Sequence, residues 1–137
     1  MKIAIGSDEA NELTTALMVQ LEKLGHQVMP FGPLAPNDPN TDWPLVASRV
    51  AEAVARGEAN EGIVCCWTGT GACIAANKVP GIRAALVHDA ETAREILNAW
   101  FATSPLEGEA QSEWNLAQIE RIRQLEEKYR ITKDKDE

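Results

Sequence analysis

Apolar runs of strand length alternate with helical patterns up to about residue 89, and this alternation most constrains the fold. The strand-like runs cover residues 2–7, 26–31, 62–67 and 82–87. Helical apolar spacing separates the first three runs, and a short helix is expected at residues 72–78 before the fourth. The resulting β-α-β-α-β-α-β order predicts the α/β class, with a parallel sheet between helices on both of its faces.

Local signals mark the boundaries of the expected helices. Gly25 is placed to end the first helix, in which four leucines recur three or four residues apart: Leu13, Leu17, Leu21 and Leu24. Thr41 and Asp42 offer N-cap chemistry just before Pro44, which suits a first helical turn. One face of that second helix is marked by Val46, Val50 and Val54.

The run from Gly62 to Trp67 is apolar at consecutive positions, which is typical of a central parallel strand. After residue 89 we expect one helix from Glu91 to about Phe101 and an amphipathic helix over about 113–130. The chain has 137 residues, so a single domain covering residues 1–137 is expected.

The acidic composition narrows the class of partner. There are 13 Lys and Arg residues against 21 Asp and Glu residues, a formal net charge of −8. This charge argues against nucleic acid and anionic membrane as main partners. A phosphorylated small molecule stays compatible, because local dipoles act at short range. No secretory leader and no membrane-spanning run is visible, so a cytoplasmic location is expected.

The three cysteines, Cys65, Cys66 and Cys73, form an odd and clustered set, which indicates reduced thiols rather than disulfides. No His lies near them at zinc-ligand spacing, so no metal site is expected. Cys65 alternates in side with Cys66 and is interpreted as a core residue, and Cys73 as helix packing. For Cys66, the residues alone favour packing and function equally.

Two strand ends are rich in functional groups, and ligands of open parallel sheets bind beyond such ends. One is the Gly-Ser-Asp-Glu of residues 6–9, and the other is the Cys-Trp-Thr-Gly-Thr-Gly of residues 66–71. A thiolate, backbone N–H donors and a carboxylate together suit proton removal next to a carbonyl, as in aldose–ketose isomerisation. The glycine loop alone is a weak signal, because many strand-to-helix turns contain two glycines.

Residues 66–71 and the run Ile-Ala-Ala-Asn-Lys-Val-Pro-Gly-Ile-Arg-Ala-Ala at 74–85 resemble the signature of a known family. This is the ribose-5-phosphate isomerase B and galactose-6-phosphate isomerase family. The similarity covers most of residues 1–94 and includes three shorter matches, at residues 6–8, 42–44 and 91–94.

The resemblance implies a Rossmann-like three-layer α/β/α sandwich, a homodimer with composite active sites, and neither metal nor organic cofactor. It implies proton transfer by Cys66 with assistance from Thr68, while the backbone of residues 67–71 holds the enediolate and Asp8 contacts sugar hydroxyls. The helix at 113–130 is expected to pack on the dimer partner. The expected substrate-binding residues are Asp8, Glu9, Trp67, Gly69, Thr70 and Gly71.

The chain departs from the family pattern within the expected site. Glu9 stands where the family usually has His, so it either takes over that role or changes the substrate. Trp67 replaces a usual Gly and puts a large ring at the mouth of the site. Packing under a dimer partner and contact with substrate are both open for this ring.

Two further departures lie in the C-terminal part. After Arg94 the sequence omits about one strand with its loops, and if this deletion is real the sheet lacks its fifth strand. A natural deletion, an engineered deletion and a segment missing from the sequence are all compatible with this. The family's phosphate-binding arginines fall on Trp114 and Gln118. Arg121 and Arg123 lie nearby, and a solvated helix face with Glu120 and Glu127 is favoured over their replacing those arginines.

The expected function is that of an aldose–ketose isomerase of a phosphorylated sugar, of the ribose-5-phosphate/ribulose-5-phosphate type, with Cys66 as base. The alternative is a non-catalytic or altered-substrate member that binds a sugar phosphate or another small anion. A weaker hypothesis is a redox response that uses Cys66 with Cys73. The expected partners are the sugar phosphate and further copies of the chain, as a homodimer or higher homo-oligomer.

Overall fold

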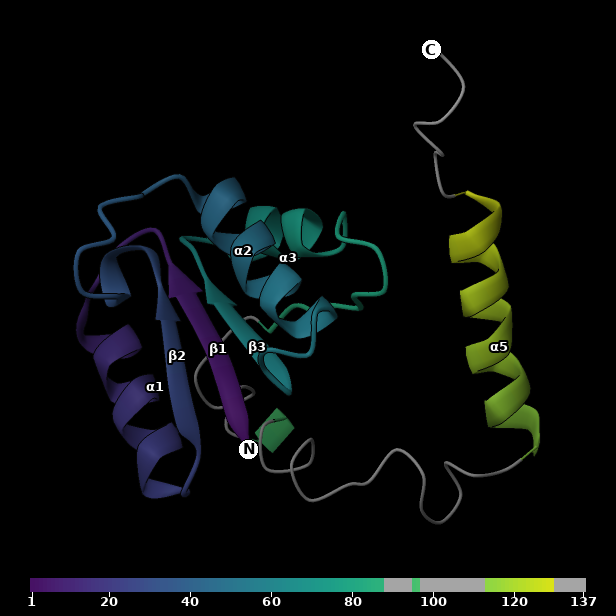
Figure 1. Cartoon of the computed structure of the whole chain (residues 1–137), viewed down its shortest axis with the longest axis horizontal. Coiled ribbons are helices and arrows are strands. Elements are labelled where there is room, and N and C mark those ends of the chain that lie inside the picture. The colour runs from purple at the N-terminus through teal and green to yellow at the C-terminus, as the bar shows by residue number, and fades with distance from the viewer. Residues whose placement is uncertain (88–94, 97–112, 130–137) are drawn as a thin grey trace. The chain divides into compact units, whose positions relative to one another are not determined.

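The computed structural model describes residues 1–87, 95–96 and 113–129 (Figure 1). The chain divides into two compact units, residues 1–88 and 89–137. The second unit contains helix α5 (Glu113–Lys128). The first unit contains, in chain order, β1 (Lys2–Ser7), α1 (Glu12–Lys23), β2 (Gln27–Phe31), the 3-10 helix η1 (Gly32–Leu34), α2 (Trp43–Ala55), β3 (Glu61–Cys65) and α3 (Thr70–Ala76).

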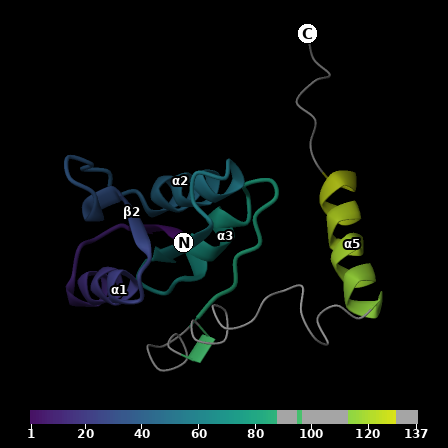
Figure 2. The same ribbon diagram turned by 60° about the horizontal axis from the view of Figure 1, so that its bottom comes forward.

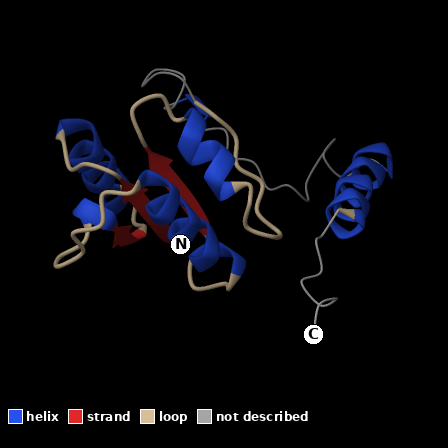
Figure 3. Cartoon of the chain, turned by 90° about the horizontal axis from the view of Figure 1, so that it is seen from above, coloured by secondary structure: helices blue, strands red, loops and turns tan. Residues whose placement is uncertain are grey.

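The strands form a parallel sheet in the order β2-β1-β3, which confirms the predicted α/β class. Helix α1 lies on one face of the sheet and α2 on the other (Figure 2). The view from above shows the strands between these helical layers (Figure 3). Strand β1 is buried from Ile3 to Ser7, so the core lies around the middle strand.

Helices α1 and α2 begin and end close to the predicted positions. Gly25 follows α1 with a φ of 80°. Of the four leucines that predicted α1, Leu21 is buried, whereas Leu13 and Leu24 are more than half exposed. On α2 the predicted apolar face is confirmed, since Val46 and Val50 are buried. Asp42 stands at the N-cap position of α2, but its side chain caps no N–H group.

Two predictions about the sheet are wrong for the described residues. The central strand is β1, and β3 lies at an edge. Residues 82–87 form no strand. The physical reason lies at Ala84, whose backbone is bound by a side chain: its N–H donates to Asn77 Oδ1, and its carbonyl accepts from Asn77 Nδ2, both at 2.9 Å. Groups that a neighbouring strand would use are therefore already satisfied.

Helix α5 confirms the amphipathic helix predicted at about 113–130. Arg123 pairs with Glu120 at 2.7 Å and with Glu127 at 3.9 Å, as expected for a solvated helix face. Its packing on a partner stays a prediction, as does the single domain. Of the helix predicted from Glu91, residues 95 and 96 are helical. The rest of that helix, the junction after Arg94 and the question of a fifth strand lie outside the described residues. No helix in the described part of the chain is long and apolar enough to cross a membrane.

Candidate functional site

A cavity of about 150 Å³ lies at the carboxyl ends of β1 and β3. The parallel register places Ser7 opposite Cys65, so the residues that follow these two strands reach the same edge of the sheet. The structure thus brings together the two strand ends that the sequence singled out. The cavity is lined by Ser7, Asp8, Glu9, Asn11, Leu13, Thr14, Cys65, Cys66 and Trp67.

The β1 wall of this cavity, residues 7–11, is held by short-range hydrogen bonds. Ser7 is buried, and its Oγ accepts from the N–H of Glu9 at 3.3 Å. Asn11 Nδ2 donates to Glu9 Oε1 at 2.7 Å, which fixes that carboxylate. Asn11 also exchanges hydrogen bonds with Thr14, closing a capping box at the start of α1.

Sequence reasoning missed Asn11 as a site residue. Asn at the last position before a helical pattern, three residues ahead of a Thr, was the available signal. The reciprocal bonds explain why Thr14 is buried without an unsatisfied hydroxyl. The side chain of Asn11 therefore connects the start of α1 to the carboxylate of Glu9.

The β3 wall, Cys65 to Trp67, consists of two partly buried thiols and one indole that is 95% exposed. Burial, helped by the neighbouring Cys66 and Asp8, raises the pKa of the Cys65 thiol to about 11. Cys65 is therefore a neutral thiol at neutral pH and a poor candidate for proton abstraction. The predicted catalytic residue Cys66 and the predicted contacts Asp8, Glu9 and Trp67 all line the cavity.

The other predicted site residues lie beside the cavity rather than in its lining. Thr68 Oγ1 accepts from the N–H of Thr70 at 3.3 Å. Gly69 precedes α3 with a φ of 73°, and a Cβ there would lie 2.6 Å from Leu86 Cδ1. A Cβ on Gly71 would lie 2.9 Å from two ring carbons of Trp43. Both glycines thus have a packing role, and their contact with substrate stays a prediction.

The described lining contains two carboxylates, Asp8 and Glu9, and neither Lys nor Arg. It is suited to binding hydroxyl groups, whereas it offers no countercharge to a phosphate. Among residues 1–87, 95–96 and 113–129, no group of three or more His, Cys, Asp or Glu side chains could hold a metal ion. The thiol of Cys73 lies outside this lining and donates to the carbonyl of Ala84 at 3.4 Å.

Comparison with known proteins gives this arrangement a context. The model of the Ribose/Galactose Isomerase family matches residues 3–113. The chain belongs to this family. The resemblance read from residues 66–85 is thereby confirmed.

Galactose-6-phosphate isomerase subunit LacB of Clostridium acetobutylicum is 42% identical over 103 residues, covering 72% of this chain and 58% of that protein. Ribose-5-P isomerase B of Listeria innocua is 39% identical over 107 residues, covering 75% of this chain and 71% of that protein. The chain thus spans little more than half of the first relative's length and over two thirds of the second's.

Among solved structures, type B ribose 5-phosphate isomerase from Trypanosoma cruzi matches with a TM-score of 0.75 and 33% identity. The match covers 94% of this chain and 100% of that one. The expected Rossmann-like three-layer α/β/α fold is confirmed. The relatives named here are sugar-phosphate isomerases, a class of intramolecular oxidoreductase.

Proposed function

We propose that this chain is an aldose–ketose isomerase of a phosphorylated sugar, of the ribose-5-phosphate/ribulose-5-phosphate type, with Cys66 as the base. One observation carries the proposal: Cys66 and Asp8 line a single cavity at the carboxyl end of a parallel sheet, in a chain that belongs to the ribose/galactose isomerase family. Thiol and carboxylate come from separate strand ends, as a site assembled by the fold requires.

In the proposed reaction the Cys66 thiolate removes the proton from C2 of the open-chain aldose. The electron pair moves onto the C1 carbonyl oxygen and gives an enediolate. Backbone N–H groups of residues 67–71 stabilise its charge, and the Thr68 hydroxyl assists Cys66. Return of the proton to C1, with proton exchange between the two oxygens, gives the ketose. No oxidant or cofactor is consumed.

The charge of the lining sets the orientation of the substrate. The carboxylates of Asp8 and Glu9 stand on the β1 wall, and like charges at short range repel. The sugar hydroxyls therefore face this wall, with Asp8 as an acceptor, and the phosphate lies away from it. We place the activity in a cytoplasmic homodimer or higher homo-oligomer, in which a second copy meets the exposed indole of Trp67.

Solvent deuterium exchange tests the proposal. Ribose 5-phosphate, galactose 6-phosphate and other pentose and hexose phosphates are incubated with the protein in ²H₂O, and isotope gain is followed by NMR. We expect exchange and isomerisation with at least one of them. Cys66→Ala should lower the rate by about 10²–10⁴-fold, as expected for loss of a general base. Cys73→Ala, which removes a thiol outside the cavity lining, is the control. Wild-type turnover in Cys66→Ala would refute the role of the thiol.

A second candidate function is binding of a sugar phosphate or another small anion without catalysis, or with an altered substrate. It is favoured by the two carboxylates in a described lining without a cation. Its non-catalytic form predicts that the wild-type protein catalyses no exchange at high concentration, while calorimetry still detects binding of a sugar phosphate. Measurable exchange excludes the non-catalytic form.

A further inference from the structure

The loop of residues 32–42, between β2 and α2, contacts both sides of the candidate site. At its start, Gly32 is buried with a φ of 63°, and a Cβ there would lie 2.7 Å from the carbonyl oxygen of Ser7. Just after its end, the Trp43 ring packs on Gly71, where a Cβ would lie 2.9 Å from two ring carbons. The conformation of this loop therefore bears on the β1 wall and on the start of α3 at once.

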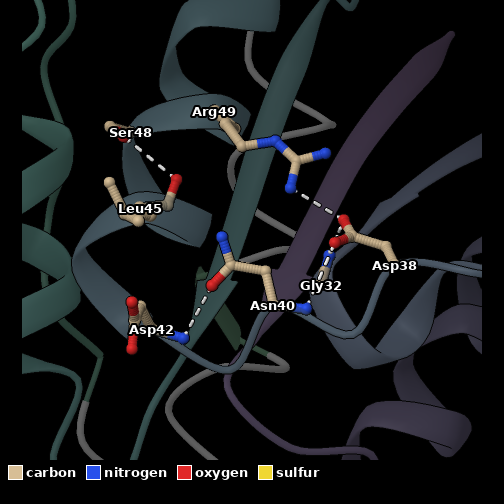
Figure 4. Close-up of polar contacts among 7 residues, drawn as sticks. All are labelled: Gly32, Asp38, Asn40, Asp42, Leu45, Ser48 and Arg49. Carbon is tan, nitrogen blue, oxygen red and sulfur yellow. Dashed lines mark hydrogen bonds and ion pairs between the residues drawn. The ribbon is translucent and has the colours of Figure 1, made fainter.

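The carboxylate of Asp38 lies at the centre of the loop's hydrogen bonds (Figure 4). Its Oδ2 accepts from the N–H of Gly32 at 2.8 Å and from Arg49 Nη1 at 2.8 Å. Its Oδ1 accepts from the N–H of Asn40 at 3.3 Å. Arg49 belongs to α2, so one side chain ties the beginning of the loop, its middle and the following helix together.

Asn40 extends this arrangement to the residue before Trp43. Its Oδ1 accepts from the N–H of Asp42 at 2.9 Å (Figure 4). A continuous series of hydrogen bonds thus runs from Gly32 through Asp38 and Asn40 to Asp42. The series begins at Gly32, beside the carbonyl oxygen of Ser7, and ends at the residue before Trp43, whose ring packs on Gly71.

The bonds to Asp38 are charge-assisted, which makes them stronger than bonds between neutral groups. The hydrogen bond from the N–H of Gly32, followed by Arg49 and Asn40, holds the pKa of Asp38 below its usual value against the opposing effect of desolvation. The carboxylate therefore stays ionised at neutral pH. Arg49 is also fixed by a second contact, since its guanidinium lies 5.3 Å from the centre of the Phe31 ring.

We propose that Asp38 is a positioning residue. Its carboxylate fixes the conformation of loop 32–42, and the loop in turn fixes the position of the β1 wall relative to residues 66–69, which connect β3 to α3. It acts through Ser7 and through Trp43 on Gly71, and it contacts no substrate. The kinetic consequence rests on the proposed isomerase function. The structural consequence, a defined environment for Cys66, does not.

The test compares Asp38→Ala and Asp38→Asn with Glu52→Ala. Glu52 is the matched control. Like Arg49 it belongs to α2, and it pairs with Arg56, the residue that caps this helix, at 2.9 Å, with both side chains exposed. Alkylation by iodoacetamide is followed at each cysteine by peptide mass spectrometry with fragment ions that separate Cys65 from Cys66. Cys65 and Cys73 serve as internal references.

We expect Asp38→Ala to speed alkylation of Cys66 by about 3–10-fold, while the alkylation rates of Cys65 and Cys73 change less than about twofold. The kcat should fall by about 10–100-fold, because small displacements of catalytic groups lower the rate by such factors. KM should change less than kcat. Asp38→Asn keeps one acceptor and the size of the side chain, so it tests the same point with a smaller loss of stability. Glu52→Ala should match the wild type.

Unchanged alkylation of Cys66 in both Asp38 variants would overturn the proposal, and so would a parallel rise at all three cysteines, which indicates general destabilisation. An unchanged kcat in an active enzyme would overturn the kinetic consequence. A wild-type protein inactive on every sugar phosphate refutes the proposed function instead. In that case the labelling pattern still decides whether Asp38 positions the cavity.

Discussion

The two walls of the cavity are built in different ways. The β1 wall follows a strand with a neighbour on each side, and Ser7 is 2% exposed. The β3 wall follows a strand at the edge of the described sheet, and Trp67 is 95% exposed. The first wall is held by hydrogen bonds among residues 7–14, whereas the turn and helix start that follow the second wall are held by side chains that pack on Gly69 and Gly71. Changes at buried positions, where loop 32–42 meets the first wall and where the two strands pair, should therefore cost stability, and changes at the exposed end of the second wall should mainly alter the site.

The largest stability effect is expected where loop 32–42 meets the β1 wall. In Gly32→Ala the Cβ would lie 2.7 Å from Ser7 O in a backbone with a φ of 63°. Strain and overpacking together should lower the free energy of unfolding by about 2–4 kcal/mol. Urea denaturation measures this loss.

Gly25→Ala is the control, because its φ is 80° but nothing lies within 4 Å of the added Cβ. It should cost only the strain of a side chain at positive φ, about 1–2 kcal/mol. Equal losses in the two variants would show that Ser7 adapts to the added methyl group, and the β1 wall would then be less rigid than its contacts indicate.

The second effect on stability appears at alkaline pH and comes from the thiol of Cys65, at the position where β1 and β3 pair. The folded-state pKa of about 11 lies above the ordinary value of 9.0. Between these values the folded chain keeps a proton that the unfolded chain releases, so stability falls as pH rises through this window and is unaffected by this thiol below it. The full loss is roughly 2–3 kcal/mol. Urea midpoints at pH 8 and pH 11 measure it.

Cys65→Ser provides the reference for that measurement, since it keeps the size of the side chain and removes the titration. Lysine and tyrosine titrations are common to both proteins and cancel in the comparison. The variant should show a smaller fall between pH 8 and pH 11 than the wild type. Equal falls would mean that the Cys65 thiol reaches solvent and ionises in the folded state.

The fold was largely predictable because each of its signals is local. The leucine and valine spacing and the position of Gly25 placed α1 and α2 within a few residues. What failed was non-local. The run Ile63-Val64-Cys65 has the composition of a central strand, yet its second neighbour is absent from the described sheet, since residues 82–87 lack strand pairing. The competing partner of Ala84 is the carboxamide of Asn77, and composition does not reveal such a pairing.

The site was predictable in part for the same reason. The rule that parallel strands end at one edge of the sheet directly predicts the cavity positions of Asp8, Glu9, Cys66 and Trp67. Asp38 and Trp43 were missed because they act through contacts with residues farther along the chain, Arg49 and Gly71. Asn11 was missed although its signal is local, since its bonds join it to Glu9 and Thr14. The residues 32–40 read as a plain Pro-rich loop, and only the bonds from Gly32 and Arg49 reveal Asp38 as its centre.

At the start of α3, beyond the β3 wall, Gly71→Ala should have a smaller effect on stability than Gly32→Ala. The Cβ would meet the Trp43 ring at 2.9 Å, but Gly71 lies inside α3, where Ala is favoured over Gly by about 1 kcal/mol. The two terms oppose each other, so the net change should stay within about 1 kcal/mol. The ring has to move, however, and the indole N–H signal of Trp43 in an NMR spectrum should shift.

Gly81→Ala is the matched control for Gly71→Ala, because nothing lies within 4 Å of its added Cβ. It should leave the Trp43 signal in place although its φ of 83° makes the substitution strained. A Trp43 signal that is unmoved in Gly71→Ala would show that the ring does not rest on this glycine, and would remove one of the two contacts assigned to loop 32–42.

The smallest effect on stability is expected at Trp67. This residue shows most clearly that the β3 wall acts on the site rather than on folding. An indole that is 95% exposed contributes little to folding of one chain, so Trp67→Ala should change the unfolding free energy by less than about 0.5 kcal/mol. Because the ring lines the cavity, the variant should raise the KM of an accepted sugar phosphate about 3–10-fold. Leu24→Ala, 53% exposed at the far end of α1, is the control for loss of apolar surface. Sedimentation of Trp67→Ala distinguishes the alternative: a dimer that dissociates while KM is unchanged would assign the ring to the partner chain rather than to the substrate.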